Sequence, residues 1–132
     1  MTRFAIDAPT ALRIVDDERE IDPRHSLVGP SLLRSDALRL LYRRVREGRI
    51  DDAAGRAKLE RLAVLKVRLL GDRVSRAVAW KIAMQLDWDD PARAEYLAVA
   101  KLQADALVAD DPTLAAAARE IIPIAAYEDL YL

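Results

Sequence analysis

The chain has 132 residues, a formal net charge of −1 and 52% hydrophobic residues, which is typical of one globular domain. It contains no cysteine and a single histidine, His25, which excludes disulfide frameworks, thiolate zinc sites and paired-histidine chemistry. Carboxylates are the groups left for metal or acid–base chemistry. No apolar stretch approaches the ~20 residues needed to cross a bilayer. Because Asp7 interrupts the first apolar run before a signal region can form, we expect a cytoplasmic protein with no membrane segment.

Short apolar runs alternate with helical patterns along the chain, which predicts a parallel sheet covered by helices on both faces. Strands are expected at residues 4–6, 26–28, 67–70, 106–109 and 121–124. Helices are expected at residues 9–15, 31–47, 51–63, 74–86, 92–103 and 112–119. The strand at 121–124 is placed at a sheet edge because Pro123 cannot donate to a ladder. The expected fold is one α/β domain over residues 1–132, with a twisted sheet of four or five strands.

Two acids directly follow apolar strands. Asp7 comes after residues 4–6, and Asp111, with Asp110 as its neighbour, comes after residues 106–109. In open parallel sheets, ligands bind beyond the carboxyl ends of the strands, so these carboxylates meet there if their strands are neighbours. The alternative is that both acids are ordinary turn residues and helix N-caps.

Two further acids interrupt apolar helix faces. Asp36 shares a face with Leu33 and Leu40, so its carboxylate is expected in the stripe that faces the core. An unpaired buried carboxylate costs several kcal/mol, so this site needs a metal ion or an arginine as its partner. Glu95 interrupts an otherwise apolar helix, and the alternative is that it lies with Arg93 on a narrow solvent-facing strip.

Four carboxylates on four elements suggest a divalent cation site. Hard oxygen ligands without imidazole or thiolate favour Mg²⁺ or Mn²⁺, which orients a water and offsets charge on phosphorus. Hydrolysis of a phosphodiester suits this ligand set best. The four residues are Asp7, Asp36, Glu95 and Asp111.

Basic and aromatic residues add two expectations. A basic stripe on one helix face could hold a phosphate backbone, or it could be a solvated surface; it consists of Arg39, Arg43 and Arg46. Trp80 and Trp88 are expected to pack against the core rather than to stack on a ligand.

The order of these acids resembles the PIN domain, and specifically the VapC-type ribonuclease toxins of type II toxin–antitoxin systems. That family opens with a strand ending in Asp, as Phe4-Ala5-Ile6-Asp7 does here. Its second acid lies early in a helix after a Pro-Ser-Leu-type segment, as in the stretch from Pro30 to Asp36. Its last acid follows an apolar strand and precedes a helix, as at residues 106–114. The similarity in element order covers nearly the whole chain.

Three positions depart from the family pattern. The second acid is usually Glu, and here it is Asp36. The third acid normally lies three residues before an aromatic residue; counting back from Tyr96 gives Arg93, with Glu95 two residues further on. A small hydroxyl residue often follows the first Asp by two positions, where this chain has Pro9. These departures are compatible with a variant site, a weak enzyme or an inactive one.

The resemblance implies a Mg²⁺- or Mn²⁺-dependent endoribonuclease. Asp7 and Asp111 would be metal ligands, and Asp36 and Glu95 would complete the site or position the water. It further implies an RNA substrate, a homodimer, and a cognate antitoxin protein that inserts a segment into the acidic groove. The alternative is a catalytically degenerate PIN-like module that binds proteins, with the Arg93 cation in place of the metal.

Overall fold

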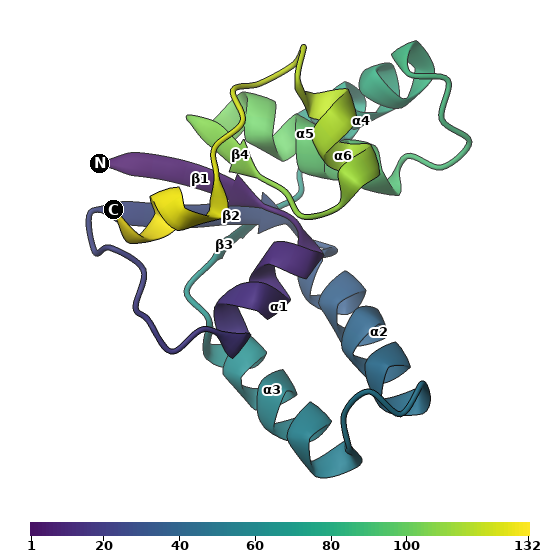
Figure 1. Cartoon of the computed structure of the whole chain (residues 1–132). Coiled ribbons are helices and arrows are strands. Elements are labelled where there is room, and N and C mark those ends of the chain that lie inside the picture. Colours follow the sequence, from purple (N-terminus) through teal and green to yellow (C-terminus); the bar gives the residue numbers. More distant parts are fainter.

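The computed structural model describes residues 1–132 as an α/β domain of three layers (Figure 1). The middle layer is an all-parallel sheet in the order β3-β2-β1-β4, formed by β1 (Thr2–Ile6), β2 (His25–Pro30), β3 (Arg68–Leu70) and β4 (Ala106–Val108). One face carries α1 (Ala8–Asp16), α2 (Leu33–Arg46) and α3 (Asp52–Val64). The other carries α4 (Arg73–Gln85), α5 (Ala92–Gln103) and α6 (Pro112–Ala118). A short 3-10 helix, η1 (Tyr127–Tyr131), follows. The predicted fold class is confirmed.

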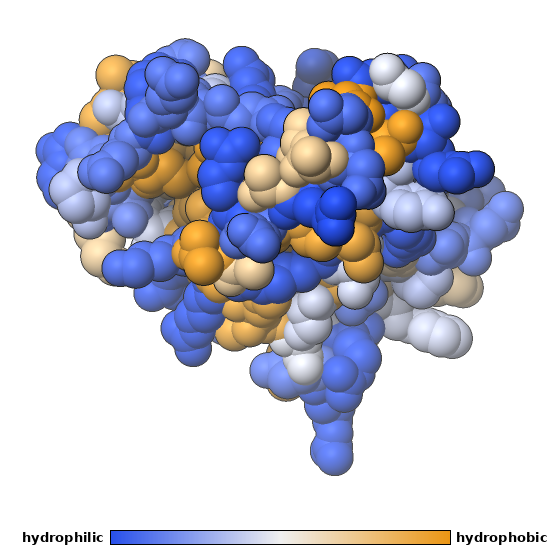
Figure 2. Space-filling view, turned by 90° about the horizontal axis from the view of Figure 1, so that it is seen from below, coloured by the Kyte–Doolittle hydropathy of each residue, from blue (hydrophilic) through white to orange (hydrophobic).

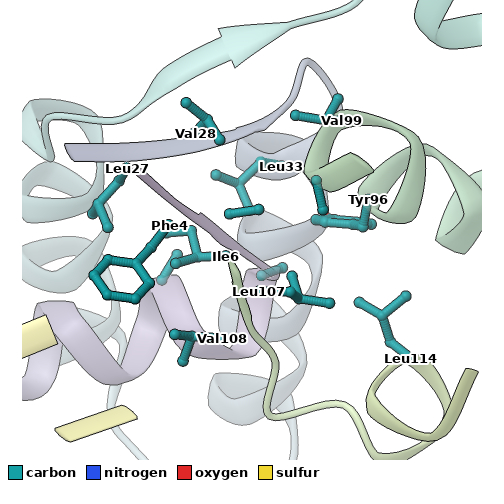
Figure 3. Packing of buried hydrophobic residues seen from close by; sticks show 14 of the residues in the cluster. Phe4, Ile6, Leu27, Val28, Leu33, Tyr96, Val99, Leu107, Val108 and Leu114 are labelled. Carbon is teal, nitrogen blue, oxygen red and sulfur yellow. The ribbon is translucent and has the colours of Figure 1, made fainter. Parts of the chain in front are cut away.

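The position of β1 inside the sheet explains why its sequence is a continuous apolar run. Both of its faces are covered by helices, so Phe4, Ala5 and Ile6 are all buried, whichever way each side chain points. Figure 3 shows side chains from β1, β2 and β4 in one cluster with side chains from the surrounding helices, including Leu33 and Leu114. The strands therefore form a rigid base beneath the residues that follow them.

Helix α5 is a central, covered helix, as its sequence predicts. It contacts β1, β2 and α4, and residues 96–100 are buried without interruption. Its alanines Ala94, Ala98 and Ala100 allow close approach of the neighbouring elements. The first turn of α5 is therefore held firmly beside the carboxyl ends of the strands.

The strand register places the two predicted post-strand acids at one edge of the sheet. Ile6, the last residue of β1, pairs with Val108, the last residue of β4. The residues that come next, Asp7 on one side and Asp110 and Asp111 on the other, are therefore neighbours. The prediction that these acids meet if their strands are adjacent is confirmed.

Two local predictions are wrong. Residues 121–124 form no strand; a single bridge joins Ile124 to Leu107 at the outer side of β4. The segment lies at the sheet edge, as expected. Pro123 has no N–H to donate, and its carbonyl only accepts a hydrogen bond from the Leu107 N–H at 2.9 Å, so the ladder does not extend. Trp88 packs against the core, whereas Trp80 on α4 is 69% exposed and is not a packing residue.

The face seen from below is largely hydrophilic (Figure 2). In the view from below, hydrophobic side chains show as small separate patches among hydrophilic ones (Figure 2). None of the helices has both the length and the apolar character that a membrane crossing requires.

Candidate functional site

A cleft of about 310 Å³ opens at the carboxyl edge of the sheet. Three of the four predicted acids line it: Asp7 after β1, Asp36 in the first turn of α2, and Asp111 after β4. These residues come from segments far apart in the sequence and meet because the parallel strands end together. The rest of the lining consists of Ala8, Pro9, Arg39, Leu40, Arg43, Asp90, Ala92, Arg93, Tyr96 and Leu114.

Asp7 forms the floor of the cleft and is 1% exposed. It is the N-cap of α1: its Oδ1 accepts hydrogen bonds from the backbone N–H of Thr10 at 3.0 Å and from the Thr10 hydroxyl. The same carboxylate accepts the backbone N–H groups of Asp110 at 3.3 Å and of Asp111 at 2.9 Å. Burial raises the pKa of Asp7, and these hydrogen bonds oppose the rise. Asp7 thus ties α1 to the segment after β4.

Asp36 forms one wall of the cleft and is held between two elements. Its Oδ2 accepts a hydrogen bond from the Tyr96 hydroxyl of α5 at 2.7 Å, and its Oδ1 pairs with Arg39 one turn along α2. Tyr96 is buried; this burial and the hydrogen bond to Asp36 raise the pKa of the phenol far above its ordinary value. The hydroxyl therefore stays a donor and fixes the orientation of the Asp36 carboxylate.

Asp111 also lines the cleft and pairs with a cation from α5. Its Oδ1 caps α6 by accepting the N–H of Thr113 at 3.0 Å, and its Oδ2 accepts the Arg93 Nε–H at 2.8 Å. The Asp110 side chain lies outside the cleft lining, where it pairs with Arg13 at 3.3 Å. Of the two adjacent acids, Asp111 is therefore the one that faces the cleft.

Glu95 does not line the cleft, so the structure does not assemble the four predicted acids into one site. Arg93 and Tyr96 are three residues apart on α5 and both face the cleft, whereas Glu95 points elsewhere on the helix. It is half-buried and near Arg76 of α4; burial raises its pKa, as do the negative charges of Asp36 and Asp90.

The arrangement of donors bears on whether the cleft suits a metal ion. No three carboxylate or histidine side chains lie close enough together to form a ready-made metal cluster. In Asp36, however, one oxygen accepts the Tyr96 hydroxyl, and the other is held only by Arg39, which is 71% exposed. In Asp111 one oxygen accepts the Thr113 N–H, and the other is held only by Arg93, which is 55% exposed. Asp7 Oδ2 accepts one hydrogen bond and has a further lone pair. If Arg39 and Arg93 swing toward solvent, each of the three carboxylates has an oxygen able to accept a further partner.

Two residues that hold the cleft carboxylates in place, Thr10 behind the cleft and Tyr96 on its lining, have roles that the sequence did not assign. Thr10 lies three positions after Asp7, which is the spacing of a helix-capping partner, so the sequence could have indicated this contact. Tyr96 gives no such signal, because an aromatic residue in an apolar helix is expected in the core. A wider groove of about 1110 Å³ lies between residues 17–27 and 61–68, and it contains none of the predicted site residues.

Comparisons with known proteins add a fold relationship. No family model matches the sequence, and no curated protein matches it. The crystal structure of PAE2754 from Pyrobaculum aerophilum is similar over 98% of this chain and 93% of that chain, with a TM-score of 0.70 and 22% sequence identity. At this identity the similarity shows that the two proteins share a fold.

Proposed function

We propose that the protein is a Mg²⁺- or Mn²⁺-dependent endoribonuclease, with its site in the cleft lined by Asp7, Asp36 and Asp111. The observation that supports this proposal is the convergence of three carboxylates from distant segments on one cleft bordered by arginines. Asp7 has a structural role as a helix cap, whereas Asp36 caps no helix and still lines the same cleft. The resemblance to VapC-type toxins points to the same chemistry.

In this proposal each residue of the cleft has a separate task. Asp7 is the fixed anchor, because its hydrogen bonds hold it in one position. Tyr96 orients Asp36, and the α6 cap orients Asp111. Arg39, Arg43 and Arg93 lie on the cleft lining, where their charges can hold the phosphates of an RNA strand.

A bound divalent cation would supply Lewis acidity and lower the pKa of a water. The reaction is the hydrolysis of a phosphodiester: a water oxygen bonds to phosphorus, the bond from phosphorus to a ribose oxygen breaks, and that oxygen takes up a proton. The carboxylates position the water, and the arginines offset charge on the phosphate. Glu95 has no task in this scheme because it lies outside the cleft.

A specific observation favours a second candidate. The Arg93–Asp111 ion pair places a cation of the chain itself in the cleft, and no metal cluster is preassembled. These features suit a catalytically degenerate, PIN-like module that acts by binding proteins. The two candidates differ in metal binding and in RNA cleavage.

The test is cleavage of total cellular RNA by the purified protein, in Mn²⁺ or in EDTA, beside Mn²⁺ binding by calorimetry. Asp36→Asn and Asp111→Asn are suitable variants because asparagine still accepts the Tyr96 or Thr113 hydrogen bond, so the fold is kept. Asp110→Asn is the matched control, since that acid lies outside the cleft. Metal-dependent cleavage that is lost in the two cleft variants and kept in the control supports the nuclease. Absence of both cleavage and Mn²⁺ binding supports the binding module.

The resemblance also brings partners and a location into the proposal. An RNA substrate, a cognate antitoxin, a homodimer and a cytoplasmic location belong together in a VapC-like toxin. Growth arrest on expression in a bacterium, relieved by Asp36→Asn but not by Asp110→Asn, would support this assignment.

A further inference from the structure

Helix α4 combines an exposed tryptophan with a positive charge that no acid of the helix offsets. Trp80 is 69% exposed, although tryptophan is on average one of the more buried residue types. The charged residues of α4 are all exposed cations: Arg73, Arg76 and Lys81. None of them forms an ion pair, and Arg76 donates only to the Gly71 carbonyl, at 3.4 Å. Both the indole and the cations are therefore available to a ligand.

The helical phase gathers these groups on the outer side of α4. Arg73, Arg76 and Trp80 follow one another at steps of three and four, which places them along one face. The exposed residue among them is Ala77, whose small side chain leaves the indole accessible. Lys81 directly follows Trp80, and the opposite side of the helix is buried against α5. The outer side of α4 thus holds one aromatic ring among three cations.

The beginning of α4 lies beside the candidate site. Burial raises the pKa of Glu95 in the first turn of α5, Asp36 raises it further, and Arg76 lowers it, so both charges are close to this residue. Asp36 lines the cleft, and Trp80 lies about one helical turn beyond Arg76. A strand that leaves the cleft past Asp36 therefore reaches Arg76 first and Trp80 next.

We propose that Trp80 stacks on an unpaired base of single-stranded RNA, and that Arg73 and Arg76 bind the phosphates next to that base. An aromatic side chain that accepts any base, combined with cations that follow the backbone, is the usual way in which proteins hold single strands. The inference rests on the proposed function for RNA as the ligand. It adds a base-contacting subsite outside the cleft, because none of these α4 residues lines the cleft.

Charge and base accessibility favour a single strand over other occupants. The arginines stand in the first turn of α4, where the helix dipole is also positive, whereas the exposed acids Asp87 and Asp89 follow the helix. The RNA path is therefore expected to end near Trp80. An apolar protein partner would bury Arg73 and Arg76 without neutralising them, which costs free energy. Duplex RNA keeps its bases inside the stack, so only unpaired nucleotides can reach the indole.

The first test is a fluorescence titration of the full chain with a short oligouridylate in EDTA, where no metal-dependent cleavage takes place. Stacking of a base on Trp80 should quench its emission. The chain has two tryptophans, and Trp88 packs against the core, so Trp80→Phe and Trp88→Phe assign the signal. Quenching that is kept in Trp88→Phe and lost in Trp80→Phe supports the proposal. Quenching that comes from Trp88, or no quenching, would overturn it.

Affinity for the same oligonucleotide, measured by anisotropy, separates stacking from apolar contact. Trp80→Leu keeps an apolar side chain without a π system and should weaken binding about tenfold, whereas Trp80→Phe should keep most of the affinity. Leu102→Ala is the control, because Leu102 is exposed on α5 away from this surface. Leucine and phenylalanine that serve equally well at position 80 would overturn the proposal and indicate a protein-binding surface. Circular dichroism checks that each variant is folded.

Salt dependence tests the phosphate contacts. Arg73→Gln and Arg76→Gln should each lower the slope of log affinity against log salt by roughly 0.7, since each removes one phosphate contact to a single strand. Lys101→Gln, in the last turn of α5, is the control and should leave the slope unchanged. An unchanged slope in both arginine variants would overturn the phosphate contacts.

Cleavage in Mn²⁺ separates a failure of this inference from a failure of the nuclease. Trp80→Leu should raise the KM for single-stranded RNA and leave kcat nearly unchanged, because Trp80 lies outside the cleft. Cleavage with the same KM in Trp80→Leu and in the parent overturns the stacking site and leaves the nuclease standing. Binding that depends on Trp80, without any cleavage, supports the stacking site and overturns the nuclease.

Discussion

The guanidinium of Arg93 donates from Nε to Oδ2 of Asp111 at 2.8 Å, and both residues line the cleft. Asp111 holds the pKa of Arg93 above its usual range, so this cation keeps its charge at any accessible pH. In the proposed nuclease, a divalent cation would have to compete with Arg93 for the same carboxylate. The strength of the ion pair would then subtract from the metal affinity of the site.

The first prediction concerns this competition. Arg93→Gln should tighten Mn²⁺ binding about fivefold, since an exposed ion pair is worth up to ~1 kcal/mol and its loss frees Asp111. Arg93→Asp should tighten it further by adding a carboxylate. The measurement is calorimetric titration with Mn²⁺. Arg13→Gln is the matched control: it breaks the neighbouring exposed pair with Asp110, which is not part of the cleft lining. Equal affinities in all three variants and the parent would contradict the competition.

The second prediction concerns the structural role of Asp7. Asp7→Ala should lower the free energy of unfolding by about 2–3 kcal/mol, because it removes a helix cap and leaves buried N–H groups of Thr10 and Asp111 without an acceptor. Asp72→Ala removes the N-cap of α4 at a more exposed site and should cost about 1 kcal/mol. Urea unfolding of both variants measures the difference. If Asp7→Ala lowers the free energy of unfolding no more than Asp72→Ala does, the hydrogen bonds between Asp7 and the segment after β4 contribute little to stability.

The third prediction is a pH dependence at Glu95. Burial and the charges of Asp36 and Asp90 raise its pKa in the folded chain, so folding disfavours its ionised form. The stability linked to Glu95 is present at pH below its unfolded pKa and is lost as pH rises through the raised folded pKa. Glu95→Gln lacks this loss. It should be more stable than the parent at neutral pH and equal to it at about pH 3.

Chemical denaturation across this pH range tests the Glu95 prediction. A stability difference that does not change with pH would mean that packing, and not charge, accounts for the effect. The same variant should bind Mn²⁺ as the parent does, because Glu95 lies outside the cleft.

The fourth prediction concerns the phenol that orients Asp36. Tyr96→Phe should lower stability by about 1–2 kcal/mol, since it removes a buried hydrogen bond to a carboxylate. It should also weaken Mn²⁺ binding several-fold, because Asp36 is then free to follow Arg39 toward solvent. Tyr42→Phe, a change at an exposed tyrosine of α2, is the control and should leave both quantities unchanged. Weakened stability with unchanged Mn²⁺ affinity would assign Tyr96 a role in packing alone.

The fold was largely predictable because β1 and most of β4 are buried. Such strands appear as continuous apolar runs, as in residues 4–6 and 106–108, and the connecting helices carry clear apolar stripes. The error at residues 121–124 has a physical cause. Ile121, Ile122 and Ile124 are suited to a strand, but the missing N–H of Pro123 leaves room for one bridge only.

The site was predictable in part. The meeting of Asp7 with Asp111 follows from a general property of parallel sheets and needed no detail of packing. The orientation of Glu95 was not predictable from composition, because it depends on the helical phase of α5. Residues two positions apart in sequence point about 200° apart around a helix. Because Arg93 is on the cleft side, Glu95 faces away from the cleft. The pairing of Arg39 and Arg93 with particular carboxylates depends on how α2 and α5 approach, which the sequence pattern does not encode.

The two structural roles of Asp7 affect how relatives of this chain should be compared. Its carboxylate caps α1 and anchors the segment after β4, so the fold itself selects for an acid at this position whether or not any chemistry takes place. An aspartate at this position in a homologue therefore indicates the same fold and says nothing about activity. Positions 36 and 93 are the informative ones, because neither caps a helix through its side chain. An acid at both positions would add a carboxylate to the cleft, whereas a cation at 93, as in this chain, pairs with Asp111.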